Sequence, residues 1–109
     1  MDLASKHCVP CEGGVAPFTE QQAQPYLSAT PGWSLGSDGT NIVRAFKFRN
    51  FNDALAFVNR VGAIAEEEGH HPDLELGWGR VHISLSTHAI KGLSENDFIL
   101  AYKINQLAK

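Results

Sequence analysis

The chain has 109 residues, of which 43% are hydrophobic, 9% aromatic and 19% charged, and its formal net charge is −3. This composition is typical of one globular domain and excludes a disordered chain. No apolar run approaches the roughly 18–20 residues of a membrane span, so we expect no membrane association. The excess of acidic residues argues against direct nucleic-acid binding. Because the amino terminus has no apolar stretch suited to a secretory signal, we expect a cytoplasmic protein.

The first residues predict a tail ahead of a single domain. We expect a flexible tail over residues 1–17 and one folded domain over residues 18–109, because termini are commonly poorly ordered. Cys8 and Cys11 form a CxxC pair, and His7 stands beside it. This pair supplies half of a four-ligand zinc site, and every other histidine lies beyond residue 69. The alternative is a tail that carries two reduced thiols.

The first half of the domain predicts a helix followed by two strands. Thr19 with Gln22 three residues later is typical of a capped helix, which we expect to run to about residue 28. Residues 34–35 suit a short strand. Residues 41–49 alternate between apolar and polar side chains in part, which favours a second strand.

The second half predicts a helix, two strands and a last helix. Asn50 suits a helix cap, and the apolar residues that follow recur at helical spacing to about residue 69. Alternating apolar residues predict strands over 74–78 and 81–87. Ser94 with Asp97 suits the start of the last helix. The apolar positions of the first of these helices are Phe51, Ala54, Leu55, Val58, Val61 and Ala65.

Short connections between consecutive strands favour antiparallel hairpins. The predicted fold class is therefore α+β, with a four-stranded antiparallel sheet and three helices packed on one face. Such a sheet leaves strand edges and one face to be covered, so we expect a homodimer or homotetramer.

The segment after the central helix breaks a local rule. Three glutamates, from Glu66 to Glu68, stand in the last helical turn, where the macrodipole disfavours negative charge. Such departures are frequent at functional sites. His70 and His71 follow, and Glu66 lies four residues before His70, where a carboxylate could orient the imidazole. A solvated helix end and a polar turn are the structural alternative.

His88 ends the predicted strand 81–87. In a hairpin with strand 74–78, the outer ends of the two strands meet, so His88 is expected near His70 and His71. Three imidazoles together indicate acid–base chemistry or a metal site. Adjacent histidines diverge on an extended backbone, whereas zinc ligands are more often two to four residues apart. No metal is therefore assigned.

These residues resemble the pterin-4a-carbinolamine dehydratases. The resemblance covers roughly residues 19–107, and no position that carries the chemistry departs from the family pattern. The motifs that carry it are Glu66-x-x-x-His70-His71-Pro72, Trp78, Val81-x-Ile83-x-Leu85-x-Thr87-His88, Gly92-Leu93-Ser94 and Asp97.

The resemblance implies dehydration of 4a-hydroxytetrahydrobiopterin to quinonoid dihydropterin, without a cofactor, in tetrahydrobiopterin recycling. It implies that His70 and His88 are an acid–base pair, that His71 binds and orients the pterin, and that Glu66 polarises this network. Further substrate contacts are implied at Gly69, Ser86, Thr87, His88, Ala89, Asp97 and Trp33. For Asp97 a purely capping role is the alternative, and for Trp33 and Trp78 a place in the core.

A second class of function stays open. One branch of the resembled family serves as a dimerisation partner of a transcription factor, so this fold can act as a non-catalytic coactivator module that binds a protein. Retention of all three histidines favours the enzyme, because a scaffold has no physical need for imidazoles in one cleft.

Overall fold

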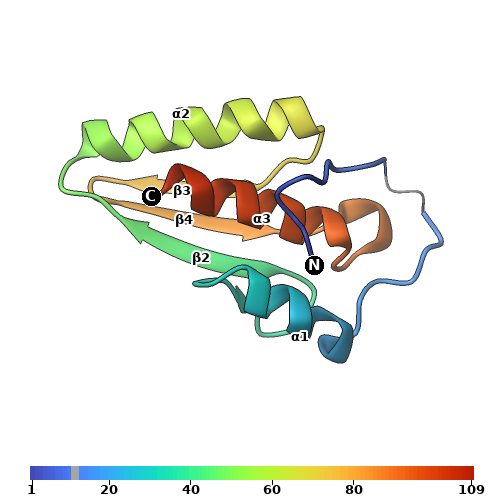
Figure 1. Cartoon of the computed structure of the whole chain (residues 1–109). Coiled ribbons are helices and arrows are strands. Elements are labelled where there is room, and N and C mark those ends of the chain that lie inside the picture. Colours follow the sequence, from blue (N-terminus) through green and yellow to red (C-terminus); the bar gives the residue numbers. More distant parts are fainter. Residues whose placement is uncertain (11–12) are drawn as a thin grey trace.

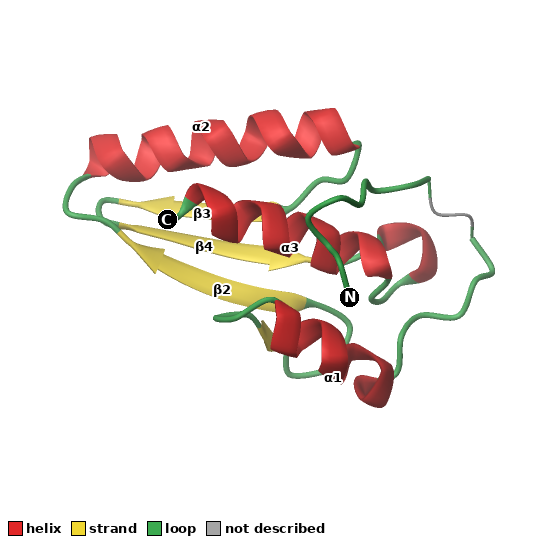
Figure 2. Cartoon of the chain, viewed as in Figure 1, coloured by secondary structure: helices red, strands yellow, loops and turns green. Residues whose placement is uncertain are grey.

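Four antiparallel strands form one sheet in the order β1-β2-β4-β3, and three α-helices accompany it (Figures 1 and 2). The computed structural model describes residues 1–10 and 13–109. The α+β fold class and the order of elements predicted from the sequence are confirmed. The elements are α1 (Glu20–Ala29), β1 (Ser34–Leu35), β2 (Ile42–Lys47), α2 (Phe51–Glu68), β3 (Asp73–Gly77), β4 (Arg80–Leu85), a short 3₁₀ helix η1 (His88–Ile90) and α3 (Glu95–Leu107).

Polar side chains determine where the α-helices begin. Each helix follows a residue whose side chain accepts a hydrogen bond from the first turn: Thr19 before α1, Asn50 before α2 and Ser94 before α3. Such caps satisfy backbone N–H groups that have no partner within the helix, and each is worth about 1 kcal/mol. The three predicted helix starts are therefore confirmed.

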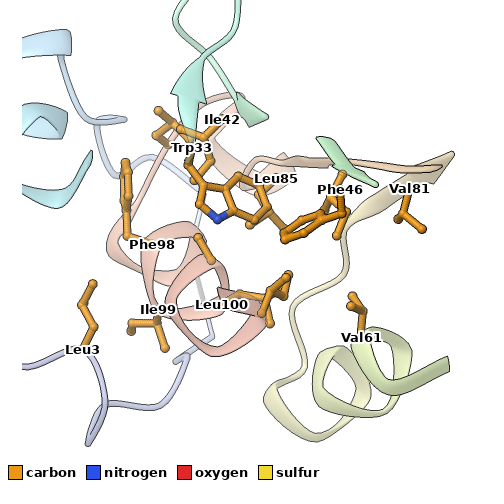
Figure 3. Close-up of a cluster of buried hydrophobic side chains, with 14 of the residues drawn as sticks. Leu3, Trp33, Ile42, Phe46, Val61, Val81, Leu85, Phe98, Ile99 and Leu100 are labelled. Atoms are coloured by element: carbon orange, nitrogen blue, oxygen red, sulfur yellow. The ribbon is translucent and has the colours of Figure 1, made fainter. Parts of the chain in front are cut away.

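The buried side chains of the central strands all lie on one face of the sheet. Every second residue of β4 from Val81 to Leu85 is buried, and the register pairs Leu85 with the buried Ile42 and Val81 with the buried Phe46 of β2. The helices supply the opposing apolar layer, as Figure 3 shows for part of it. Buried helical side chains of this layer include Phe57, Val61, Phe98, Ile99, Leu100 and Ile104.

The longest helix, α2, has one buried stripe. Ala54, Phe57, Val61 and Ala65 are at most 2% exposed, and polar residues occupy much of the remaining surface. This pattern is that of a helix that covers a sheet in water. Within residues 1–10 and 13–109, no helix is both long and apolar enough to cross a membrane.

The first ten residues, called the N-terminal segment from here on, lie alongside α3 (Figure 1). A flexible tail over residues 1–17 was the expectation from sequence, whereas Leu3 is only 2% exposed and belongs to the core. Lys6 Nζ also lies 2.8 Å from Glu95 Oε2. These partners are far apart along the chain, so no local sequence pattern indicates them.

We predict that Phe57→Ala lowers the free energy of unfolding by about 3–5 kcal/mol, because it leaves a cavity between α2 and the sheet. Phe57 is 1% exposed, and the centroid of its ring lies 4.8 Å from the ring centroid of Phe46 and 5.1 Å from that of Phe48. Asn59→Ala, at an exposed position of the same helix, is the matched control. It should change stability by less than about 0.7 kcal/mol in denaturant titrations. Equal losses for both variants would contradict this description of the core.

Candidate active site

One end of the β3–β4 hairpin brings the three predicted histidines together. The register pairs Asp73 with Ser84, so residues 70–72, which precede β3, lie beside residues 86–88, which follow β4. The proximity inferred from hairpin geometry is therefore present in the structure.

A cavity of about 230 Å³ opens at this end of the sheet. Ligand pockets of drug-sized molecules measure about 300–1,000 Å³, so this one suits a small molecule. A larger cavity of about 410 Å³ lies between α2 and α3, with no histidine among its described lining residues. Seven of the ten site residues predicted from the sequence line the smaller cavity, whose lining is Val9, Pro10, Gly69, His70, His71, Ser86, Thr87, His88, Ala89 and Asn96.

The turn at Gly69 delivers the first histidine to this cavity. Gly69 has a φ of 65°, in the left-handed region that glycine adopts most readily, and it ends α2. The N–H group of His70 then donates to the carbonyl oxygen of Ala65 at 3.2 Å. The helix therefore stops before His70 and the chain turns towards β3.

A buried carboxylate holds His70. His70 Nε2 lies 2.6 Å from Asp97 Oδ1, and the two side chains are 11% and 0% exposed. Asp97 Oδ2 accepts hydrogen bonds from Thr87 Oγ1 at 2.9 Å and from the Ser94 N–H group at 3.0 Å. Because an ionised carboxylate only accepts hydrogen bonds, Nε2 of His70 is the protonated nitrogen in that state. Asp97 thus fixes the orientation and the tautomer of His70 and leaves Nδ1 to exchange a proton.

The glutamate expected to orient His70 contacts its neighbour instead. Glu66 Oε2 is hydrogen-bonded to His71 Nε2, and the two side chains are 77% and 62% exposed. The helical i,i+4 spacing from Glu66 to His70 does not apply, because α2 ends at Glu68 and Gly69 turns the chain. An exposed pair of this kind stabilises the fold by about 0–1 kcal/mol. The partner of His70 is Asp97, 27 residues further along the chain.

His88 lies in a short helix and not at the end of a strand. β4 ends at Leu85, and His88 opens η1 with its side chain exposed. The N–H group of Thr87 donates to the carbonyl oxygen of Gly92 at 2.8 Å, which closes the loop that contains η1. This loop keeps His88 at the cavity although regular strand pairing has ended.

The two tryptophans lie away from the cavity. Trp33 is 5% exposed in the core (Figure 3), and its Nε1–H group donates to Asn105 Oδ1 at 2.8 Å. Trp78 is 70% exposed and lies between β3 and β4, at the opposite end of the hairpin from His70. The substrate contact expected at Trp33 is therefore corrected to a place in the core, where the large ring packs edge-on against Phe46.

Sequence reasoning missed three residues that line the cavity, namely Val9, Pro10 and Asn96. Asn96 directly precedes Asp97 in the first turn of α3. Its position next to a predicted site residue is a signal that could have indicated Asn96. The sequence holds no such signal for Val9 and Pro10, because this stretch is held by hydrogen bonds of Cys8 and Val9 to residues 60 and 87 positions away.

The zinc interpretation of the CxxC pair falls partly outside the described residues, because Cys11 is not among them. His7 Nδ1 lies 2.9 Å from Glu68 Oε2. Among the described residues, no group of three or more His, Cys, Asp or Glu side chains is placed to hold a metal ion.

Cys8 is half-buried beside α2 and α3. Its N–H group donates to Glu68 Oε1 at 2.7 Å, and its Sγ lies 3.5 Å from the carbonyl oxygen of Asn96. Burial raises the pKa of the Cys8 thiol to about 12, and the negative charge of Glu68 adds to the rise. The thiol therefore stays protonated at neutral pH.

A family model described as pterin 4 alpha carbinolamine dehydratase matches residues 16–107. The chain belongs to this family. The membership inferred from the His-His-Pro and Thr-His motifs is thus confirmed.

Relatives within the pterin carbinolamine dehydratase family match nearly the whole chain. A protein of Halorhodospira halophila named "Putative pterin-4-alpha-carbinolamine dehydratase" is 57% identical over 107 residues, which are 98% of each chain. A protein of Rubrobacter xylanophilus with the same name is 49% identical over 106 residues, 97% of this chain and 98% of its own.

Solved structures share the fold. A protein of Brucella melitensis described as a transcriptional coactivator/pterin dehydratase has a TM-score of 0.81 and 33% identity, over 85% of this chain and 99% of its own. A pterin dehydratase-like protein described as a RuBisCO assembly factor in the alpha-carboxysome has a TM-score of 0.63 and 25% identity, over 72% of this chain and 90% of its own.

We predict that the Cys8 thiol reacts slowly with iodoacetamide. At pH 8 a rise in pKa from 9.0 to about 12 lowers the thiolate fraction by roughly 10³, and the higher nucleophilicity of the more basic thiolate recovers only part of this loss. In a Cys11→Ser variant we expect alkylation roughly 30-fold slower than for a peptide thiol, with a rate that rises with pH through pH 9 and beyond. Urea should restore the ordinary rate. Fast alkylation of the folded variant would contradict the burial of Cys8.

Proposed function

We propose that this protein is a 4a-hydroxytetrahydrobiopterin dehydratase. The reaction removes water from the carbinolamine and gives the quinonoid dihydropterin. The C4a–O bond breaks, and the oxygen leaves with its electron pair and an added proton as water. The adjacent nitrogen N5 loses its proton, and the electron pair of that N–H bond forms the new C4a–N5 double bond.

This elimination needs one group that gives a proton and one that takes a proton. Imidazole can do either near neutral pH, and each positioned group contributes about 10²–10⁴-fold in rate. His70 and His88 carry out the two transfers, one at the leaving oxygen and one at N5. The proton reaches or leaves His70 at Nδ1, because Nε2 is bonded to Asp97.

The remaining residues of the cavity bind the heterocycle. His71 orients the pterin, and Glu66 polarises the His71 ring through their hydrogen bond. The backbone at Gly69 and from Ser86 to Ala89 supplies polar groups along the cavity wall. Asp97 acts through His70 and is a positioning residue.

The observation that carries this proposal is the pair of the buried Asp97 and the largely buried His70 at a cavity that His71 and His88 also line. A buried carboxylate that fixes one imidazole tautomer is a recurring device of acid–base catalysis. Membership of the family and the residues that line the cavity both support the proposed dehydratase function.

The second candidate is a protein-binding role without catalysis. The Brucella melitensis relative is described as a transcriptional coactivator as well as a pterin dehydratase, and the carboxysome relative as an assembly factor. The His70–Asp97 pair favours the enzyme, because protein docking does not require a carboxylate and an imidazole with almost no exposed surface. Homo-oligomerisation, the cytoplasmic location and the lack of a cofactor stay predictions.

We predict that His70→Ala lowers kcat/KM for dehydration of 4a-hydroxytetrahydropterin by about 10²–10⁴-fold, because one of the two proton transfers loses its group. The carbinolamine is generated in situ and its decay is followed by absorbance above the uncatalysed rate. His82→Ala is the matched control: His82 lies in β4, does not line the cavity, and its loss should change the rate by less than about twofold.

Circular dichroism should show both variants folded. An unchanged rate for folded His70→Ala would contradict the role of His70. A folded wild-type protein that does not accelerate dehydration would contradict the dehydratase and favour the protein-binding candidate.

A further inference from the structure

The N-terminal segment crosses one side of the cavity. Its last two residues, Val9 and Pro10, line the cavity together with the histidines. Gly13 lies near one lining residue of this cavity, because a Cβ atom added at Gly13 would lie 3.6 Å from the carbonyl oxygen of Ala89. None of the predicted catalytic roles uses this segment.

Asn96 clamps the backbone of Val9. Its Oδ1 atom accepts a hydrogen bond from the Val9 N–H group at 3.0 Å, and its Nδ2 atom donates to the Val9 carbonyl oxygen at 2.6 Å. Asn96 is 5% exposed, and it precedes Asp97 in the first turn of α3. The same helical turn therefore holds Val9 through Asn96 and His70 through Asp97.

Further contacts hold the segment in the free protein. The Glu68 side chain, only 3% exposed, accepts a hydrogen bond from the Cys8 N–H group and contacts the ring of His7. Leu3 is buried in the core. A wall that is already ordered costs little conformational entropy when a ligand binds.

The clamp presents an aliphatic side chain in a cavity that is lined mainly by polar residue types. Val9 is 66% exposed although two hydrogen bonds fix its backbone. The histidines, Ser86, Thr87 and Asn96 make most of the remaining lining polar. A flat heterocycle has hydrogen-bonding edges and apolar faces, so a complementary site needs both kinds of surface.

We propose that Asn96 is a positioning residue that holds Val9 and Pro10 as an apolar wall against the bound reduced pterin. This inference rests on the proposed function and deepens it. The wall contributes to substrate binding and takes no part in proton transfer. Its loss therefore raises KM and the dissociation constant of a reduced pterin much more than it lowers kcat.

The test compares Asn96→Ala and Val9→Ala with the wild type. The probe is 7,8-dihydrobiopterin, a reduced pterin without the hydroxyl group that is eliminated, and its binding is followed by fluorescence. We expect the dissociation constant and KM to rise by about five- to tenfold in both variants, with a much smaller change of kcat. Val15→Ala is the matched control, because Val15 is also an exposed valine near the amino terminus but does not line the cavity. It should leave both constants within about twofold of the wild type.

Hydrogen exchange of the wild-type protein gives a second measurement that does not depend on the folding of a variant. If Val9 contacts the pterin, the pterin binds the closed N-terminal segment more tightly than the open one. Saturating 7,8-dihydrobiopterin then slows the opening of the segment, and with it the exchange of the Cys8 and Val9 amide hydrogens. Exchange at Val15 should stay unchanged. A structural role of Asn96 alone would not produce this protection.

Two failures can be distinguished. Unchanged binding constants in folded Asn96→Ala and Val9→Ala, with no added protection at Val9, would overturn this inference and leave the dehydratase intact. A wild-type protein that neither binds the reduced pterin nor accelerates dehydration would overturn both.

Discussion

The carboxylate of Asp97 joins the parts of the molecule on which the site depends. One oxygen contacts His70 just beyond α2, and the other accepts hydrogen bonds from Thr87 just beyond β4 and from the Ser94 N–H group at the start of α3. Because Asp97 has no exposed surface, each of these groups replaces water as a partner of the charge. The same carboxylate caps α3 and orients the His70 ring. A change at Asp97 therefore affects both the stability of the start of α3 and the geometry of the site.

The helices and the sheet could be predicted because their signals are local. Caps at Thr19, Asn50 and Ser94 and the alternation along β4 each depend on a few neighbouring residues. The meeting of the histidines could be predicted too, since the register of a short hairpin determines which residues face each other across its open end.

The interpretations that failed concern contacts between distant parts of the chain. Glu66 matched the spacing of a helical partner for His70, but the helix ends at Glu68 and Asp97 takes that place. Trp33 was expected to contact the substrate, whereas its indole is buried beside Phe46 and bonded to Asn105. The packing of the N-terminal segment depends on Glu68, Asn96 and the core, none of which a local pattern can indicate.

The proposed proton transfers depend on one claim about the molecule, namely that Asp97 selects the tautomer of His70. Nitrogen-15 NMR of the histidine rings, with His70 assigned by comparison with His70→Ala, tests it directly. In the neutral ring we expect a proton on Nε2 and none on Nδ1, and an Asp97→Asn variant should weaken this preference. A neutral His70 ring with its proton on Nδ1 would contradict the claim, since Nε2 could then only accept a hydrogen bond from a protonated Asp97.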